Sequence, residues 1–330
     1  MTQTIPDTMQ AVAFDEPGGP DVLKPVTCPT PSPGAGEVLV KVTAAGVNGP
    51  DLVQRRGHYP PPKGASPLLG LEVSGTIVAT DSAVTDWQVG DQVCALTNGG
   101  GYADYVAVNS GHCLEIPGGV DVVDAAGLPE TYFTVWSNIF QGQTIPEGGN
   151  FLVHGGSGGI GSTAVQLGTA MGLNVYTTVP DDEAAAFVTD LGATRAINYT
   201  DEDFVPILRD AGGADIVLDI IGGDYIARNI KASRHDGRIV QIAFNAGSKV
   251  QIDLMPVMLK RLTFTGSTLR SRPDASKTAI AADLARIVWP LFAKGDLRPV
   301  THRALALKDA SEAHRLMESA EHMGKLLLLP

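Results

Sequence analysis

The segment that most constrains the fold is FLVHGGSGGIG at residues 151–161, where an apolar run meets a glycine-rich turn. A segment of helical composition, STAVQLGTAMG, follows at 162–172. Gly156, Gly158 and Gly161 have G-x-G-x-x-G spacing in the strand–turn–helix context that a dinucleotide-binding loop requires. The first glycine then permits a tight turn, the second lets a pyrophosphate approach the backbone, and the third allows close packing of helix on strand. A purely structural turn is the weaker alternative.

The other residues of this loop are predicted to contact the phosphates of the same dinucleotide. The helix that begins here directs unpaired N–H groups and a positive dipole end at an anion. Ser157 adds a hydroxyl, and Gly159 and Ile160 add backbone N–H groups. The GGSGG run fits phosphate binding better than a nucleophile elbow, because the chain offers no Ser–His–Asp arrangement.

The composition narrows the class of protein. The chain has 330 residues, 44% of them hydrophobic, and a net charge of −12 from 24 basic and 36 acidic side chains. Such an acidic chain without a basic cluster is a poor candidate for binding nucleic acid. Three cysteines provide no disulfide framework, and we find no secretory signal or apolar run long enough to span a bilayer. We therefore expect a cytoplasmic protein with no membrane partner.

The chain reads as two domains, the first of them discontinuous. Residues 1–124 are β-rich, with strands predicted at 38–47 and 73–80 between Pro- and Gly-rich loops. Residues 125–267 alternate between strands and helices, which predicts a doubly wound parallel sheet. Residues 268–330 hold two amphipathic helical patterns and a final strand, and we expect them to complete the first domain. Within the second domain the strands are expected at 151–154, 174–179, 193–199, 214–223, 237–244 and 261–267.

Several stretches resemble the zinc-free quinone oxidoreductase branch of the medium-chain dehydrogenase/reductase superfamily, and within it the p53-inducible subgroup. The resemblance covers nearly the whole chain and implies an α/β fold, with a GroES-like β-rich catalytic domain and a Rossmann doubly wound parallel-sheet domain. The stretches that carry the resemblance are FDEPGGPDVL, NGPDLVQRRGHYPPPKGAS, LGLEVSG, LPETYFTVW, the glycine loop, LDIIGG, DGRIVQIA and STLRSRP. Among them, NGPDLVQRRGHYPPPKGAS is the most specific to the subgroup.

The residues also argue against zinc. Zinc needs thiolate, imidazole or carboxylate ligands in close sets, and Cys28, Cys94 and Cys113 are too far apart in sequence for a structural four-cysteine site. The zinc-dependent branch carries a catalytic cysteine and a G-H-E motif. The matching positions here read Ala-Gly-Val at 45–47 and Gly-Leu-Glu at 70–72. The expected thiolate and imidazole are both missing, so no metal site is predicted.

Three residues are candidates for the catalytic pocket. The resemblance places Asn48 on the floor of the nicotinamide pocket, Tyr59 over the active site as a hydrogen-bond donor to a quinone oxygen, and Thr131 facing the cofactor. From the residues alone, Asn48 could equally cap a turn, Tyr59 could be packing, and Thr131 could cap a helix. The resemblance also implies that Ile221, Phe244, Leu269 and Lys325 bind the cofactor.

The remaining polar candidates have structural interpretations. His58, His112 and His154 lack the spacing of metal ligands and are predicted to be surface or hydrogen-bonded core histidines. Asp51, with the arginines that follow it at 55 and 56, is predicted to form an ion pair on a helix surface.

The choice between NADH and NADPH depends on the turn after residues 174–179. Asp181 lies about 20 residues beyond the glycines, where an acidic residue hydrogen-bonds the ribose 2′-OH and repels a 2′-phosphate. The family usually prefers NADPH and has a lysine nearby, but Ala184 stands at that position, next to Asp182. A 2′-phosphate would need Arg195, Arg270 or Lys325, whereas Tyr199 could stack on the adenosine. Alternatively, the two aspartates only cap a helix. The local charges favour NADH slightly.

These features predict an NAD(P)H-dependent reductase that passes a hydride to a quinone or related enone held between the two domains, below the Tyr59 loop. An enoyl-thioester or enone reductase of the same fold is the nearest alternative. A cofactor-binding redox-responsive or structural protein with negligible turnover is a further one. The strand predicted at 261–267 is the last of its sheet, and such an edge invites pairing with a second copy. We therefore expect a homodimer through this strand.

Overall fold

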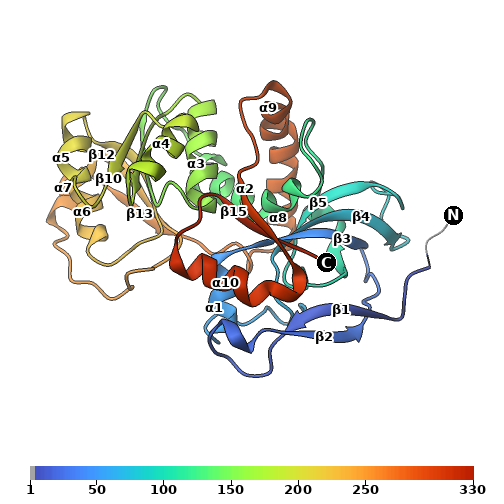
Figure 1. Cartoon of the computed structure of the whole chain (residues 1–330). Helices are drawn as coiled ribbons and strands as arrows, with labels where there is room; N and C mark the ends of the chain where they lie inside the picture. Colours follow the sequence, from blue (N-terminus) through green and yellow to red (C-terminus); the bar gives the residue numbers. More distant parts are fainter. Residues whose placement is uncertain (1–3) are drawn as a thin grey trace. The chain divides into compact units, whose positions relative to one another are not determined.

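The computed structural model describes residues 4–330, and its chain divides into two compact units (Figure 1). One unit, the catalytic unit, comprises Met1–Phe133 and Arg270–Pro330, and the other, the nucleotide unit, comprises Thr134–Leu269. Among the described residues, no helix is long and apolar enough to cross a membrane.

The nucleotide unit is built on a six-stranded sheet in the order β10-β9-β8-β11-β12-β13. Every neighbouring pair is parallel, so the predicted doubly wound sheet is confirmed. Its strands are β8 (Asn150–His154), β9 (Asn174–Val179), β10 (Arg195–Asn198), β11 (Ala214–Asp219), β12 (Ser233–Gln241) and β13 (Thr263–Gly266). Its helices are α3 (Gly159–Ala170), α4 (Asp182–Asp190), α5 (Phe204–Asp210), α6 (Tyr225–Ala232) and α7 (Met255–Leu259).

The strand order places the glycine loop at the point where the sheet changes direction. The chain leaves β8 for β9 and β10 on one side, then returns to β11, β12 and β13 on the other. Ligands of open α/β sheets bind at such a switch point, beyond the carboxyl ends of the strands. Leu152 of β8 and Val217 of β11 are fully buried, because parallel strands are covered on both faces. The core therefore fixes the strand from which the loop emerges.

The catalytic unit contains a seven-stranded sheet in the order β14-β15-β3-β4-β5-β7, with β6 paired to β3 and a separate β1–β2 ribbon. Its strands are β1 (Thr8–Ala13), β2 (Lys24–Pro29), β3 (Glu37–Val47), β4 (Glu72–Thr80), β5 (Gln92–Leu96), β6 (Tyr105–Asn109), β7 (Cys113–Glu115), β14 (Thr301–Ala306) and β15 (Lys325–Leu329). Its helices are α1 (Gly49–Arg55), α2 (Pro129–Val135, whose last two residues belong to the nucleotide unit), α8 (Asp274–Asp283), α9 (Trp289–Lys294) and α10 (Ala310–Ser319).

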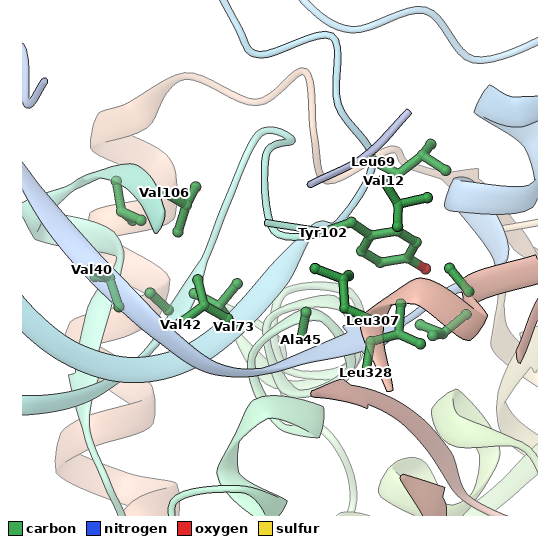
Figure 2. Packing of buried hydrophobic residues seen from close by; sticks show 14 of the residues in the cluster. Val12, Val40, Val42, Ala45, Leu69, Val73, Tyr102, Val106, Leu307 and Leu328 are labelled. Carbon is green, nitrogen blue, oxygen red and sulfur yellow. The ribbon is translucent and has the colours of Figure 1, made fainter. Parts of the chain in front are cut away.

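The C-terminal strand β15 joins this sheet beside β3, with Leu326 opposite Val47. Valines and leucines of β3, β4, β6 and β15 fill the interior, together with the ring of Tyr102 (Figure 2). Burial of this apolar surface stabilises the sheet by roughly 25 cal/mol per Å². The consequence for the site is that the start of β15, at Lys325, is held next to the end of β3 and residue 48.

The ion pair predicted on the surface of α1 is wrong. Asp51 and Arg55 are both fully buried. Asp51 accepts hydrogen bonds from the N–H groups of Asn48, at 2.9 Å, and Gly70, at 3.0 Å. Arg55 instead pairs with Glu318 of α10. The helix is covered on its charged face by a distant segment, which the local sequence does not reveal.

Candidate active site

The glycine loop of the nucleotide unit leaves almost no room for side chains. A Cβ atom at Gly156 would lie 2.0 Å from Oγ1 of Thr177, and one at Gly161 would lie 2.1 Å from the carbonyl oxygen of Gly155. The left-handed residue of the turn is Gly155, with φ of +72°. The tight turn assigned to Gly156 is therefore made by Gly155, while Gly156 is required for close approach to β9.

The start of α3 is open to a ligand. Gly158 is the N-cap, and an added Cβ there would have only the carbonyl oxygen of Gly155 nearby, at 3.7 Å. Ser157, Gly159 and Ile160 are half-buried, so the loop keeps an accessible surface. The first N–H groups of a helix have no intrahelical acceptor. The cradle fits the pyrophosphate of a dinucleotide, because it combines these donors with a backbone that a ligand can approach closely.

A buried polar network joins the strand ends behind this loop. His154 bonds to Thr178 Oγ1 at 3.0 Å through Nδ1 and to Asn229 Oδ1 at 2.7 Å through Nε2. Asn229 in turn donates to Asp219 at 2.9 Å, and burial lowers the pKa of His154. His154 is thus a hydrogen-bonded core histidine, as predicted. Asp219 also accepts from the N–H of Ile221 at 2.6 Å, so the network fixes the backbone of a predicted cofactor contact.

The turn after β9 is acidic. Asp181 is the exposed N-cap of α4, and its Oδ1 accepts a hydrogen bond from Ala184 N at 2.8 Å. Asp181 therefore caps α4, and its second carboxylate oxygen remains for another partner. Asp182 is also exposed. Tyr199 is 46% exposed and follows β10.

The basic residues considered for a 2′-phosphate already have partners. Arg195 forms an ion pair with Glu202. Arg270 and Lys325 are both buried within the catalytic unit, where each is hydrogen-bonded. Among the other predicted cofactor contacts, Phe244 is 46% exposed and Leu269 is buried.

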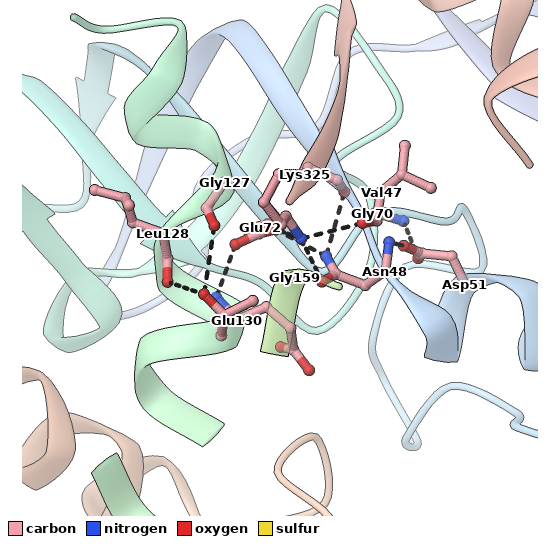
Figure 3. A network of polar contacts seen from close by, with 12 residues as sticks. Val47, Asn48, Asp51, Gly70, Glu72, Gly127, Leu128, Glu130, Gly159 and Lys325 are labelled. Atoms are coloured by element: carbon pink, nitrogen blue, oxygen red, sulfur yellow. Dashed lines mark hydrogen bonds and ion pairs between the residues drawn. The ribbon is translucent and has the colours of Figure 1, made fainter. Parts of the chain in front are cut away.

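The catalytic unit contains a buried cluster of charges around Asn48 (Figure 3). Asn48 Nδ2 donates to Glu72 Oε1 at 2.9 Å, and its Oδ1 accepts from Lys325 Nζ at 2.6 Å. Lys325 Nζ also pairs with Glu72 at 2.6 Å and donates to the carbonyl of Val47 at 3.1 Å. Glu72 Oε2 accepts the N–H of Glu130 at 2.8 Å. Each charge is compensated, so the cluster rigidly orients Asn48.

This cluster includes the segments 45–47 and 70–72, which the resemblance matches to the cysteine and G-H-E positions of the zinc-dependent branch. A Cβ atom at Gly46 would lie 2.0 Å from Glu72 Oε1, so the carboxylate fills the space that a cysteine side chain would need. The ammonium of Lys325 binds the same oxygen. Among residues 4–330 no three His, Cys, Asp or Glu side chains are grouped to hold a metal ion. The Lys325 ammonium lies among the oxygens of Glu72 and Asn48. A positive charge at that position does not fit a zinc ion, which needs anionic or neutral ligands around it.

Tyr59 belongs to a second polar group in the same unit. Its ring lies 5.6 Å from the Arg270 guanidinium, and burial raises the pKa of its phenol. Arg270 Nη1 donates to Gln54 at 2.7 Å, and Nη2 donates to the carbonyl of Asn98 at 2.6 Å. Lys277 Nζ donates a hydrogen bond to Asn98 Oδ1 at 2.7 Å. Tyr59 is therefore protonated at neutral pH and has a fixed cation against its ring.

Thr131 is fully buried on α2, and its hydroxyl donates to the carbonyl of Leu128 at 3.2 Å. Neighbouring Glu130 is also buried. Sequence reasoning missed Glu72, Glu130 and Lys277 as members of the site. Glu72 could have been found from the sequence, because it is the glutamate of the Gly-Leu-Glu motif at 70–72. Nothing in the local sequence indicates Lys277.

A sheet unit with a buried polar cluster and a parallel-sheet unit with a glycine loop define a two-domain oxidoreductase. The GroES-like domain of alcohol dehydrogenases matches residues 34–118, and the zinc-binding dehydrogenase family matches residues 159–284. Quinone oxidoreductase from Lama guanicoe is 30% identical over 332 residues, which cover 97% of each chain.

Two further similarities bear on function. The crystal structure of Escherichia coli quinone oxidoreductase with NADPH has a TM-score of 0.84 at 26% identity, and covers 97% of this chain and 100% of that one. A mycocerosic acid synthase-like polyketide synthase of Mycobacterium tuberculosis is 29% identical over 300 residues, which cover 90% of this chain but only 14% of the synthase. The chain belongs to the quinone oxidoreductase branch of the medium-chain dehydrogenase/reductase superfamily.

Proposed function

We propose that this protein is an NAD(P)H-dependent quinone oxidoreductase that works without zinc. The observation that carries the proposal is the Glu72 carboxylate packed against Gly46 and bound to the Lys325 ammonium. An enzyme that oxidises alcohols in this fold would need a metal in that region to activate the hydroxyl. A quinone is a strong electron acceptor and takes up a hydride without one.

The nucleotide unit would bind the cofactor through its backbone. The pyrophosphate would lie against Ser157, Gly158 and Ile160 at the start of α3. The nicotinamide supplies the hydride, and the protein supplies orientation and exclusion of water. The second carboxylate oxygen of Asp181 would accept a hydrogen bond from the ribose 2′-OH. We therefore propose NADH as the preferred donor, although the Escherichia coli relative was crystallised with NADPH.

The catalytic unit would bind the substrate through Tyr59, Asn48 and Thr131. The Tyr59 phenol remains protonated because its pKa is raised, so it would donate to a quinone oxygen as negative charge develops there. Asn48 is held from both ends of its amide by Glu72 and Lys325 and would form a rigid floor. Thr131 would line the wall of the pocket.

The test is steady-state oxidation of NADH and of NADPH with 1,4-benzoquinone as the acceptor, before and after dialysis against EDTA. We expect turnover with both donors, a higher kcat/KM with NADH, and no loss on chelation. The kcat/KM of the Tyr59→Phe variant should fall by roughly 10- to 150-fold, because a hydrogen bond to a charged group contributes about 1.5–3 kcal/mol. Absence of oxidation with either donor would refute the proposal.

Reduction of enones or enoyl thioesters is a second candidate. The matched portion of the polyketide synthase is in keeping with chemistry on carbon–carbon double bonds. That reaction must deliver a proton to carbon after the hydride, so it needs a proton donor in the pocket. Crotonyl thioester and a medium-chain enone as alternative acceptors would decide which substrate class has the higher kcat/KM.

We also propose a homodimer through the edge of the nucleotide sheet. β13 is the last strand of that sheet, as predicted, and its Phe264 is 47% exposed. The neighbouring α7 region exposes Met258 to 68% and Met255 to 62%. Apolar side chains beside an open strand edge form a surface that a second copy can cover. Sedimentation at micromolar concentration should show twice the chain mass.

A further inference from the structure

Among the buried carboxyl groups of the described residues, Glu130 stands out because its oxygens have no hydrogen-bond partner, unlike those of Asp51, Glu72 and Asp219. It is the second residue of α2, and its backbone N–H is the group that binds Glu72. The side chain is 9% exposed. It extends away from the charge cluster (Figure 3) and makes no hydrogen bond or ion pair with any residue from 4 to 330. Its carboxyl oxygens are not among the fully enclosed unpartnered atoms, so the carboxyl keeps a small exposed surface. Burial of most of the side chain still disfavours the charged form.

The groups that face Glu130 favour its protonated form. Burial is the largest effect, and the carboxylates of Glu72 on β4 and Asp51 on α1 act in the same direction. Lys325 on β15 and Lys277 on α8 oppose them. The balance raises the pKa of Glu130 to about 8. The side chain therefore carries a proton at neutral pH, and a modest change of environment would release it.

Glu130 is close to the residue that we place on the substrate oxygen. Burial raises the pKa of the Tyr59 phenol, and an ionised Glu130 carboxylate would raise it further. Burial lowers the pKa of the Arg270 guanidinium, and an ionised Glu130 carboxylate would oppose that lowering. Both interactions lie within the catalytic unit. Thr131, the next residue along α2, is a predicted pocket residue, and both residues belong to the first turn of this helix.

We propose that Glu130 is the proton donor that completes the reduction when the substrate is an α,β-unsaturated carbonyl compound. This inference rests on the proposed function. Hydride transfer brings two electrons and one hydrogen to the β-carbon, and the carbon–carbon π electrons move to give an enolate. The O–H bond of Glu130 then breaks as a C–H bond forms at the α-carbon, and solvent returns a proton to the carboxylate. One NAD(P)H and one proton are consumed for each carbon–carbon double bond reduced.

A quinone makes a smaller demand on this residue. After hydride transfer its anion carries the charge on oxygen, and oxygen exchanges protons with water rapidly. Protonation at carbon is slow without a positioned acid, and such acids contribute about 10²–10⁴-fold in rate. The two acceptors therefore separate the role of Glu130 from the role of the cofactor.

The experiment compares the wild type with Glu130→Gln on trans-3-octen-2-one and on 1,4-benzoquinone, with NADH and NADPH in excess, from pH 6 to 10. We expect kcat/KM for the enone to fall by about 10²–10⁴-fold and that for the quinone by less than tenfold. The wild-type rate with the enone should be level below about pH 8, the pKa of Glu130, and decline above it. This decline should be absent in Glu130→Gln and retained in Glu130→Asp.

Glu16→Gln is the matched control, because Glu16 is an exposed glutamate of the same unit. In ²H₂O the wild type should place deuterium on one face of the α-carbon, whereas Glu130→Gln should lose this selectivity. An enone rate within twofold of the wild type in Glu130→Gln, with the pH decline intact, would overturn the inference. If the wild type reduces the quinone but not the enone, the inference about Glu130 is overturned while the proposed function stands. A wild type inactive on both would refute the proposed function as well.

Discussion

Alanine at two glycines of the same loop should have different effects. Gly161→Ala would place a Cβ atom 2.1 Å from the Gly155 carbonyl oxygen and 2.6 Å from the Gly156 Cα. Both contacts are with backbone, which cannot rotate away. Gly158→Ala would meet nothing closer than 3.7 Å, at a φ of −75° that alanine readily adopts. The first change should therefore distort the fold, and the second should alter only the surface presented to the cofactor.

The magnitudes follow from these contacts. Overpacking costs about 1–3 kcal/mol, and each kcal/mol lowers the Tm of a unit this size by roughly 2–4 °C. We expect Gly161→Ala to melt about 2–12 °C lower. At Gly158 the loss of a preferred N-cap residue is offset by the lower entropy of the unfolded chain, about 0.4–1 kcal/mol. Its Tm should change little.

Cofactor binding should be weakened mainly in Gly158→Ala, the variant whose Tm changes little. The added methyl group of Gly158→Ala would lie on the accessible surface against which we place the pyrophosphate. A strain of about 1–3 kcal/mol corresponds to a Kd roughly 5–150-fold higher. Titration calorimetry with NADH and NADPH, together with thermal melts of the free protein, measures both quantities. A Gly158→Ala variant that binds as tightly as the wild type, or a Gly161→Ala variant with an unchanged Tm, would refute the reasoning.

Three further predictions follow from buried and exposed side chains. Lys325→Met should lower the free energy of unfolding, measured with urea, by about 3–5 kcal/mol, because the fully buried Glu72 loses its cation. A decrease of less than about 1 kcal/mol would contradict this. Burial lowers the pKa of His314 to about 3, while its Nδ1 contacts Arg55 at 3.1 Å. Between this pKa and the usual value of 6.5, His314 is protonated in the unfolded chain but not in the folded one. The free energy of unfolding therefore decreases as the pH is lowered below about 6.5, by about 2 kcal/mol at pH 5. His314→Gln should lack this component. Met258→Glu should shift a dimer to monomer in sedimentation, with kcat per chain as the control.

The sequence determined the class of fold because its signals are local. The glycine spacing requires only consecutive residues, and the apolar strands at 151–154, 174–179 and 214–219 are recognisable by composition. All three lie in the parallel sheet. Strand β14 was not predicted, because most of its side chains are exposed and an edge strand of this kind lacks an apolar pattern.

Tertiary structure decided the chemistry of the buried charges. Asp51 and Arg55 read as a surface pair, since spacing along a helix cannot show that α10 covers that face. Likewise, Lys325 meets Asn48 only because β15 pairs with β3 across some 280 residues of chain. Glu130 acquires its raised pKa mainly from burial, and carboxylates on two other elements add to it. Local sequence sets the backbone conformation, but burial and electrostatics depend on which distant segments pack together, and only the folded chain fixes those.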